Sequence, residues 1–321
     1  MKSISLKLLV SSAIACMPCV VAAQNAGPIT VVVPFGPGAS ADVMMRLVTS
    51  KVTQQTQQQV IVENKPGASG IIGAEQVKNA NSQNPVLFQS SIGTHGVNPP
   101  LFGPKLPYDA VKDFKSVGML WRFPSVLAVP TQSGITDVAG LLKAADRPNG
   151  LTYGSPGIGT GGHLLGAMLS KAVGKPMTHI PYKGAAPAVV DLAGNRIDFM
   201  FASYASFRSL VDEGRVRILA VASDKRLELL PNVPTLEELQ VKDVDVMNWF
   251  GLSAPKTTSD ETVAHLSKVF ANAVRDPDVV KRMKDEGVEA VGGTPEAYAR
   301  EIQREIDRYT TVIKEFGITA Q

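Results

Sequence analysis

The chain has 321 residues, with 32 lysines and arginines against 29 aspartates and glutamates, and a formal net charge of +3. This near balance does not favour nucleic acid or a membrane surface as the partner, because such partners select proteins with a strong excess of basic side chains. Hydrophobic residues make up 44% of the chain, which is ordinary for a globular protein.

The N-terminus has the three parts of a secretory signal peptide. Lys2 and Lys7 form a basic start, an apolar stretch covers 8–21, and small residues precede Gln24. We therefore predict that residues 1–23 are removed and that the mature protein acts outside the cytoplasm. The rival interpretation is a membrane anchor, but the stretch is shorter than the roughly 20 residues that a spanning helix needs.

Both cysteines, Cys16 and Cys19, lie inside this leader. The mature chain is therefore expected to contain neither a thiol nor a disulfide, although it is exported to an oxidising compartment. A lipoprotein processed at Cys16 is the alternative, but Ala13-Ile14-Ala15 lacks the leucine usual before such a cysteine. Removal of the leader takes away two lysines and no acid, so 32 basic residues become 30 against 29 acidic ones.

The mature chain starts with alternating strands and helices. Runs of β-branched and apolar residues predict strands at 29–33, 60–63 and 86–89. Helices are predicted at 40–56, with Ser40 as the cap, and near 72–79.

Two long apolar segments, 117–129 and 246–254, are predicted to be strands that cross between two lobes. The same alternation of strands and helices resumes between them. Strands are expected at 151–154, 177–180, 197–201 and 218–222, and helices from about Gly162 and near 185–193.

The last helix has clear end signals, with Thr294 as cap, Pro295 in its first position and Gly317 as its stop. Alternating strands and helices predict an α/β fold with open sheets, in which ligands bind beyond the carboxyl ends of the strands. We therefore expect a signal peptide at 1–23, a first lobe from 24–122 and 249–321, and a second lobe from 123–248, joined by two crossover strands and separated by a central cleft.

We expect the glycine-rich loops to form the ligand-binding site. Three lie between a strand and a helix, at 35–40, 66–70 and 155–162, and a fourth loop at 90–95 follows the third strand. Such turns present backbone N–H groups and the positive end of a helix, which together attract an anion. Each loop alone is also explained as an ordinary tight turn. Several at one edge of the sheets favour a carboxylate site.

One of these loops also matches a dinucleotide pattern, because Gly157, Gly159 and Gly162 satisfy G-x-G-x-x-G between a strand and a helix. A dinucleotide site needs an acidic residue about 20 positions later, at the end of the next strand. The first acid after this loop is Asp191, which comes too late in the chain. We therefore expect no nucleotide cofactor.

The sequence contains no recognisable motif of a catalytic or metal-binding centre. There is no G-x-S-x-G motif, and the four histidines have no metal-ligand spacing and no evident carboxylate partner. A periplasmic hydrolase acting on a carboxylate-bearing substrate stays the alternative function. Because His163 begins a helix beside a glycine loop, its ring is a candidate to contact an anion. The histidines are His95, His163, His179 and His265.

Ordered motifs run along the whole mature chain. The most specific are Val33-Pro-Phe-Gly-Pro-Gly-Ala-Ser-Ala-Asp-Val43 and Val62-Glu-Asn-Lys-Pro-Gly-Ala-Ser-Gly70. Leu106-Pro-Tyr-Asp109, Pro181-Tyr-Lys-Gly184 and Gly292-Gly-Thr-Pro295 follow in order. As a series they closely resemble the Bug family, the TctC-like substrate-binding receptors of tripartite tricarboxylate transporters.

The resemblance implies a periplasmic, two-lobed binding protein of the type II or "Venus flytrap" kind. It implies no cofactor, no metal and no catalysis, a monomer, and a small carboxylate ligand delivered to a large and a small integral membrane subunit or used for sensing. The ligand contacts implied for this chain are Phe35, Gly38, Ala39, Ser40, Ala41, Asp42, Ser91, Thr94, His95, Ser155, Gly159, Thr160, Gly161, Gly162, His163, Ala202, Ser203 and Tyr204.

This chain departs from the family pattern at three places. Ala202 and Ser203 stand where Asp-Asn is frequent, so an acidic residue that could meet an amine is missing. Gly161 and Gly162 replace larger side chains, which predicts a roomier pocket, and Ile71 replaces a frequent asparagine. We expect a mono- or dicarboxylate without an amine, aromatic acids included.

Overall fold

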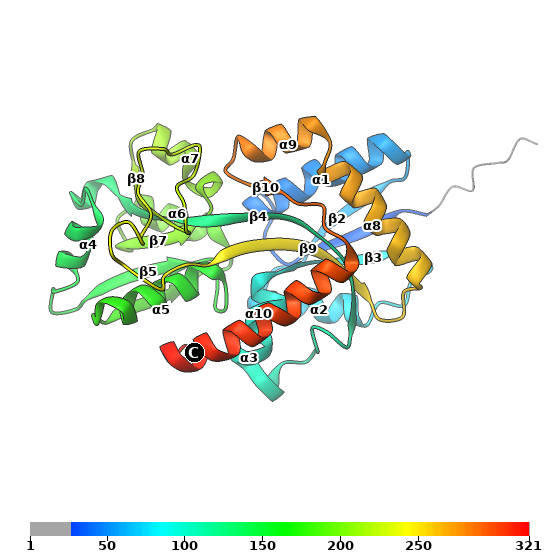
Figure 1. Cartoon of the computed structure of the whole chain (residues 1–321), viewed down its shortest axis with the longest axis horizontal. Coiled ribbons are helices and arrows are strands. Elements are labelled where there is room, and N and C mark those ends of the chain that lie inside the picture. The colour runs from blue at the N-terminus through cyan, green and yellow to red at the C-terminus, as the bar shows by residue number, and fades with distance from the viewer. Residues whose placement is uncertain (1–26, 321) are drawn as a thin grey trace, which may run out of the picture.

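The structure is a computed structural model, and it describes residues 27–320. The predicted leader, 1–23, and both cysteines lie outside the described residues. Two long antiparallel strands, β4 (Phe114–Pro130) and β9 (Met247–Pro255), join the two halves of the molecule, as the apolar segments predicted (Figure 1). β4 pairs with β9 as far as Pro124, and from Ser125 onward it pairs with β8 of the other half.

The first lobe is built on β-branched strands that are covered on both faces. Its sheet has the order β2-β1-β3-β9-β4, with β1 parallel to β2 and β3. Val31, Val33 and Leu87 are fully buried against α1 and α8, where Met45 and Phe270 complete the core. The remaining elements are β1 (Ile29–Val33), β2 (Val60–Asn64), β3 (Val86–Ser91), β10 (Glu289–Ala290), α1 (Ser40–Thr56), α2 (Ile71–Lys78), α8 (Asp260–Val274) and α9 (Pro277–Lys284).

The second lobe repeats this plan in the middle of the chain. Its parallel strands follow the order β7-β5-β6, and β7 pairs with the C-terminal half of β4. β8 also pairs with this half of β4. Phe199 and Phe201 are fully buried in its core. The elements are β5 (Leu151–Ser155), β6 (Met177–Pro181), β7 (Phe199–Ala202), β8 (Val216–Ala222), α4 (Val138–Ala144), α5 (Gly161–Val173), α6 (Ala185–Ala193) and α7 (Tyr204–Asp212).

The C-terminal helix α10 (Pro295–Phe316) begins and ends where its signals predicted. Thr294 Oγ1 accepts the backbone N–H of Ala297 at 3.3 Å, and Gly317 ends the helix with φ of 62°. Its buried face, with Ile302 and Tyr309, packs on β4 and also reaches α5 of the second lobe (Figure 1).

Two local predictions differ from the structure. Ser40 does not cap α1: the N-cap is Ala39, and the Ser40 hydroxyl points to the second lobe instead. The segment predicted as a loop at 90–95 is largely a helix, η2 (Ile92–Val97), which continues into α3 (Asn98–Phe102). Reciprocal bonds between Ser91 and Thr94 start this helix, and α10 packs against it.

The division into lobes at 122/123 and 248/249 stays a prediction, although β4 changes its pairing partner close to the first position. Within residues 27–320, no helix combines the length and the apolarity required to cross a membrane.

Candidate functional site

A small cavity lies between the lobes, at the carboxyl ends of β1, β3, β5 and β7. Its volume is about 70 Å³. A wider mouth of about 240 Å³ adjoins it and shares Phe35, Ser91 and Thr160 with it. The cavity is lined by Phe35, Ala39, Ser40, Ala41, Ser91, Ile92, Gly93, Phe123, Ser125, Pro156, Thr160, Gly161, Gly162, Ala185, Phe201, Ala202, Ser203, Ser206, Asn248 and Phe250.

The cavity is electrically neutral as far as side chains are concerned, because none of the residues that line it is ionisable. Lys183, which lines the mouth, is the one charged residue there. Phenylalanines supply much of the wall: Phe250 meets Phe35 edge-on, with ring centroids 5.7 Å apart, and stacks on Phe123 at 6.0 Å. Positive potential inside the cavity must therefore come from the backbone.

Four helices begin at the cavity without a side-chain cap: α1, α5, α6 and α7. The backbone N–H groups of Ser40, Ala41, Gly161 and Gly162 donate to no acceptor among residues 27–320. Unpaired N–H groups at a helix start form a site for an anion. By contrast, four helices that begin away from the cavity have side-chain caps: α4, α8, α9 and α10, capped by Asp137, Ser259, Asp276 and Thr294.

Asp42 holds the loop between β1 and α1 in shape. Its carboxylate accepts the backbone N–H of Gly38 at 2.9 Å, Asn64 Nδ2 at 2.8 Å and Arg46 Nε at 3.1 Å. Burial alone would raise the pKa of Asp42, but the bonds from Arg46, Asn64 and Gly38 outweigh it and hold that pKa below its usual value. Asp42 therefore stays ionised, faces Arg46 rather than the cavity, and positions the uncapped start of α1.

The glycine loop of the second lobe is held from behind by two histidines. His163 Nδ1 accepts the backbone N–H of Gly159 at 3.1 Å, and its ring stacks on His179 with centroids 4.1 Å apart. His179 Nε2 lies 2.7 Å from Ser155 Oγ, which also donates to the backbone oxygen of Gly157. This serine–histidine pair is not a nucleophile and its base, because Ser155 is fully buried and does not line the cavity.

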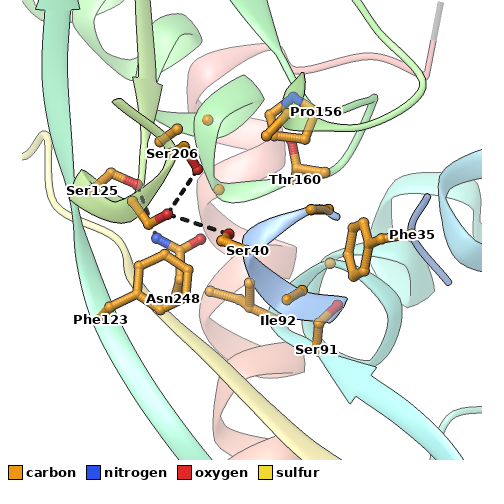
Figure 2. A pocket seen from close by; sticks show the side chains of 18 of the residues that line it. Phe35, Ser40, Ser91, Ile92, Phe123, Ser125, Pro156, Thr160, Ser206 and Asn248 are labelled. Atoms are coloured by element: carbon orange, nitrogen blue, oxygen red, sulfur yellow. Dashed lines mark hydrogen bonds between the residues drawn. The ribbon is translucent and has the colours of Figure 1, made fainter. Parts of the chain in front are cut away.

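Neutral polar groups from both lobes and from the crossing strands meet at one side of the cavity (Figure 2). Ser203 Oγ donates to Ser40 Oγ at 3.3 Å, across the two lobes, and lies 2.9 Å from Ser206 Oγ. On the crossing strands, Asn248 Nδ2 donates to Ser125 Oγ at 3.0 Å. Figure 2 shows Ser125 and Asn248 together with Phe123, opposite Phe35.

The structure brings ten of the predicted contact residues to the cavity wall. They are Phe35, Ala39, Ser40, Ala41, Ser91, Thr160, Gly161, Gly162, Ala202 and Ser203. Thr94 lies at the mouth. Gly38, Asp42, Ser155, Gly159 and His163 do not line the cavity; Gly38 is exposed, and all five take part in hydrogen bonds that shape the loops. Tyr204 is half-buried against the core of the second lobe.

His95, also predicted as a contact, is placed away from the cavity. Its side chain is fully buried, and its ring packs on Phe88, Tyr108 and Phe114. Nδ1 lies 3.2 Å from Thr94 Oγ1. The ring therefore supports the Ser91–Thr94 turn from the core, and we do not propose it as a ligand contact.

Sequence reasoning missed the contribution of the crossing strands, which bring Phe123, Ser125, Asn248 and Phe250 to the cavity. A usable signal was present, since Asn248 is a lone amide between Met247 and Trp249 in an apolar strand. The pairing of Phe123 with Asn248 across β4 and β9 brings the two segments together, and no local pattern reveals it.

The space expected at Gly161 and Gly162 is already filled, so the prediction of a roomier pocket is wrong. A Cβ on Gly161 would lie 2.1 Å from Asn248 Oδ1, and one on Gly162 would lie 2.5 Å from the backbone oxygen of Phe201. The missing side chain at position 161 is thus replaced by the amide of Asn248, which reaches in from β9.

Comparison with known proteins identifies relatives over almost the whole chain. A family described as "Tripartite tricarboxylate transporter family receptor" matches residues 44–318. A Pseudomonas sp. (strain P51) protein, "UPF0065 protein in tcbD-tcbE intergenic region", is 38% identical over 295 residues, covering 91% of this chain and 87% of that protein. Protein BugT of Bordetella pertussis is 31% identical over 294 residues, covering 91% and 90%.

Two solved structures with ligands are also similar. "R. palustris Rpa4515 with adipate" has a TM-score of 0.88 and 31% identity, covering 92% of this chain and 99% of that one. "MatC (Rpa3494) from Rhodopseudomonas palustris with bound malate" has a TM-score of 0.83 and 30% identity, covering 89% and 98%. Both structures contain a carboxylate in a protein of the same fold.

Proposed function

The chain belongs to the family of tripartite tricarboxylate transporter receptors, and from this we propose that it is a periplasmic solute-binding protein that captures a small mono- or dicarboxylate in the cavity between its lobes. The observation that carries the proposal is the set of four uncapped helix starts, α1, α5, α6 and α7, around a neutral cavity.

A carboxylate is the ligand that this arrangement favours. Each helix start carries about half a positive charge and free N–H donors, so starts contributed by both lobes can hold one carboxylate between them. A cationic ligand is disfavoured because the cavity has no acidic side chain to balance it. The similar proteins crystallised with adipate and malate support the same class.

The volume of the cavity favours a short ligand. At about 70 Å³ it has roughly half the volume of a cavity of about 150 Å³ that binds benzene. We therefore propose an aliphatic acid of a few carbons rather than an aromatic one. A longer dicarboxylate would extend into the mouth, where Lys183 offers a counter-charge.

The family also suggests where the protein acts. We propose that it works in the periplasm as a monomer and presents its ligand to a large and a small integral membrane subunit, with sensing as the other use. The predicted leader at 1–23 supports export, and the family description supports the transporter partners.

A thermal-shift screen of the mature protein tests the binding function. Short mono- and dicarboxylates are compared with their carboxamides, for example butyrate with butyramide and succinate with succinamide. A true ligand at a hundredfold excess over its Kd stabilises the fold by about 2.7 kcal/mol. We expect stabilisation by at least one acid and by no amide. Equal stabilisation by both members of a pair would contradict anion recognition.

A further inference from the structure

Asn248 lies on β9 at the side of the cavity formed by the crossing strands (Figure 2). Its side chain is only 8% exposed. Nδ2 donates to Ser125 Oγ at 3.0 Å and to the backbone oxygen of Val246 at 3.4 Å. Because a backbone carbonyl can only accept a hydrogen bond, these contacts fix which end of the amide is Nδ2. Oδ1 is consequently the end that remains for the cavity.

Asn248 Oδ1 accepts no hydrogen bond from residues 27–320. It faces the start of α5, so closely that a Cβ on Gly161 would lie 2.1 Å from it. The side chain has little contact with water, so a donor group of a ligand would be the main partner available to its amide oxygen. The protein holds the amide in place through Nδ2 and leaves the acceptor for something else.

We propose that Asn248 is a specificity-determining residue, whose Oδ1 accepts a hydrogen bond from a hydroxyl group of the bound acid. The inference rests on the proposed function and narrows the ligand to short hydroxy-substituted monocarboxylates. The helix starts hold the carboxylate, and Asn248 recognises the hydroxyl group at the uncharged part of the ligand.

The neighbouring groups do not make this distinction. Ser125, Ser203 and Ser206 line the same cavity, but a hydroxyl can donate or accept and adapts to either kind of ligand atom. An amide oxygen accepts only. An unsubstituted acid would leave it unpaired, and a second carboxylate would place another acceptor against it. An ammonium group would donate to it, but its charge would remain unbalanced.

Calorimetry with matched pairs of acids tests the inference. The mature protein is titrated with lactate and propionate, with 3-hydroxybutyrate, 4-hydroxybutyrate and butyrate, and with succinate and 4-aminobutyrate. At least one hydroxy acid should bind about tenfold more tightly than its parent acid, which is the usual scale for one such hydrogen bond. Asn248→Ala should abolish that preference while the affinity for the parent acid changes little. Asn272→Ala, at an exposed asparagine on α8, should leave both affinities unchanged.

The outcomes separate the two proposals. Equal affinity for hydroxy and parent acids in the unmodified protein overturns the role of Asn248 but leaves carboxylate binding intact. Absence of binding by every acid overturns the proposed function itself. If a folded Asn248→Ala variant weakens both members of a pair equally, the residue is structural only and the inference fails. Should that variant not fold, Gly161→Ala displaces the same oxygen from the other side, and a preserved hydroxyl preference there would overturn the inference.

Discussion

We expect three histidines, the buried His95 and His163 and the half-buried His179, to make this fold sensitive to acid. Burial lowers the pKa of His95 to about 3 and that of His163 to about 4. Burial, together with the adjacent His163 ring, lowers the pKa of His179 to about 3. The neutral ring of His163 is also required locally, because its Nδ1 accepts the N–H of Gly159.

The sign of the pH dependence follows from these values. Unfolded histidines bind a proton below about pH 6.5, whereas the folded ones stay neutral down to about pH 3 to 4. Their contribution to stability is therefore complete above pH 6.5 and decreases as the pH falls. We expect the free energy of unfolding to drop by at most about 1.4 kcal/mol per pH unit for each such histidine between pH 6 and pH 4, with the contribution of His163 levelling off near pH 4.

Urea denaturation at several pH values measures this slope. His163→Gln keeps an acceptor for the N–H of Gly159 but cannot take up a proton in this range, so its slope should be shallower than that of the unmodified protein. A profile that stays flat from pH 6.5 to pH 4.5 would show that the histidines are not held neutral by the fold.

At the level of secondary structure, the strands and helices were predictable because each is specified locally. The strand at 29–33 and the helix at 185–193 have the observed bounds of β1 and α6, and both crossing strands were predicted from apolar runs. The start of α1 was less predictable. A serine before a helix normally caps it, but here Ser40 Oγ bonds to Ser203 Oγ of the other lobe.

The part of the cavity wall formed by local loops was predictable, and the part formed by the crossing strands was not. Glycine loops at strand ends are visible in the sequence, and they supply the contacts from β1, β3 and β5. Ser125 and Asn248 are far apart in the sequence and meet only because β4 and β9 pair. His95 was predicted as a ligand contact because it is a polar residue in the loop after β3. Its ring instead packs into the aromatic core beside Phe88, away from the cavity.

Polar contacts away from the cavity connect the two lobes, and we call this set of contacts the latch: Arg208 with Asp285 and Glu286, and Lys284 with Glu228. Arg208 of α7 donates to the backbone oxygen of Asp285 at 2.9 Å and to Glu286 Oε1 at 3.1 Å, just beyond α9. Lys284 Nζ pairs with Glu228 Oε2 at 2.9 Å across the same gap. A partly exposed ion pair contributes about 0.2–1 kcal/mol, so the latch should bias the molecule modestly toward the closed arrangement.

Arg208→Ala should therefore weaken ligand binding by about two- to fivefold, without any change at the cavity. The expected cause is a larger open population, visible as a higher radius of gyration by small-angle X-ray scattering in the absence of ligand. Arg215→Ala is the matched control, because its ion pair with Glu213 lies within one lobe. Equal effects of the two substitutions on affinity would contradict the latch.

Considered as a whole, the molecule is two similar α/β lobes whose helix starts face each other across the hinge. The lobes are in contact in this structure: a Cβ on Gly93 would lie 3.3 Å from the backbone oxygen of Gly159, and one on Gly159 would lie 2.8 Å from Asn98 Oδ1. Closure thus brings the starts of α1 and α5 to one cavity, which neither lobe forms by itself. A ligand that bridges them stabilises the closed arrangement by its differential affinity.

A crystal structure of the mature protein with the tightest-binding acid from the screen tests the central claim most directly. We predict that the carboxylate lies between the lobes, within hydrogen-bonding distance of backbone N–H groups at the starts of both α1 and α5, among them those of Ser40, Ala41, Gly161 and Gly162. A carboxylate held by Lys183 at the mouth, with the helix starts facing only water, would contradict this account.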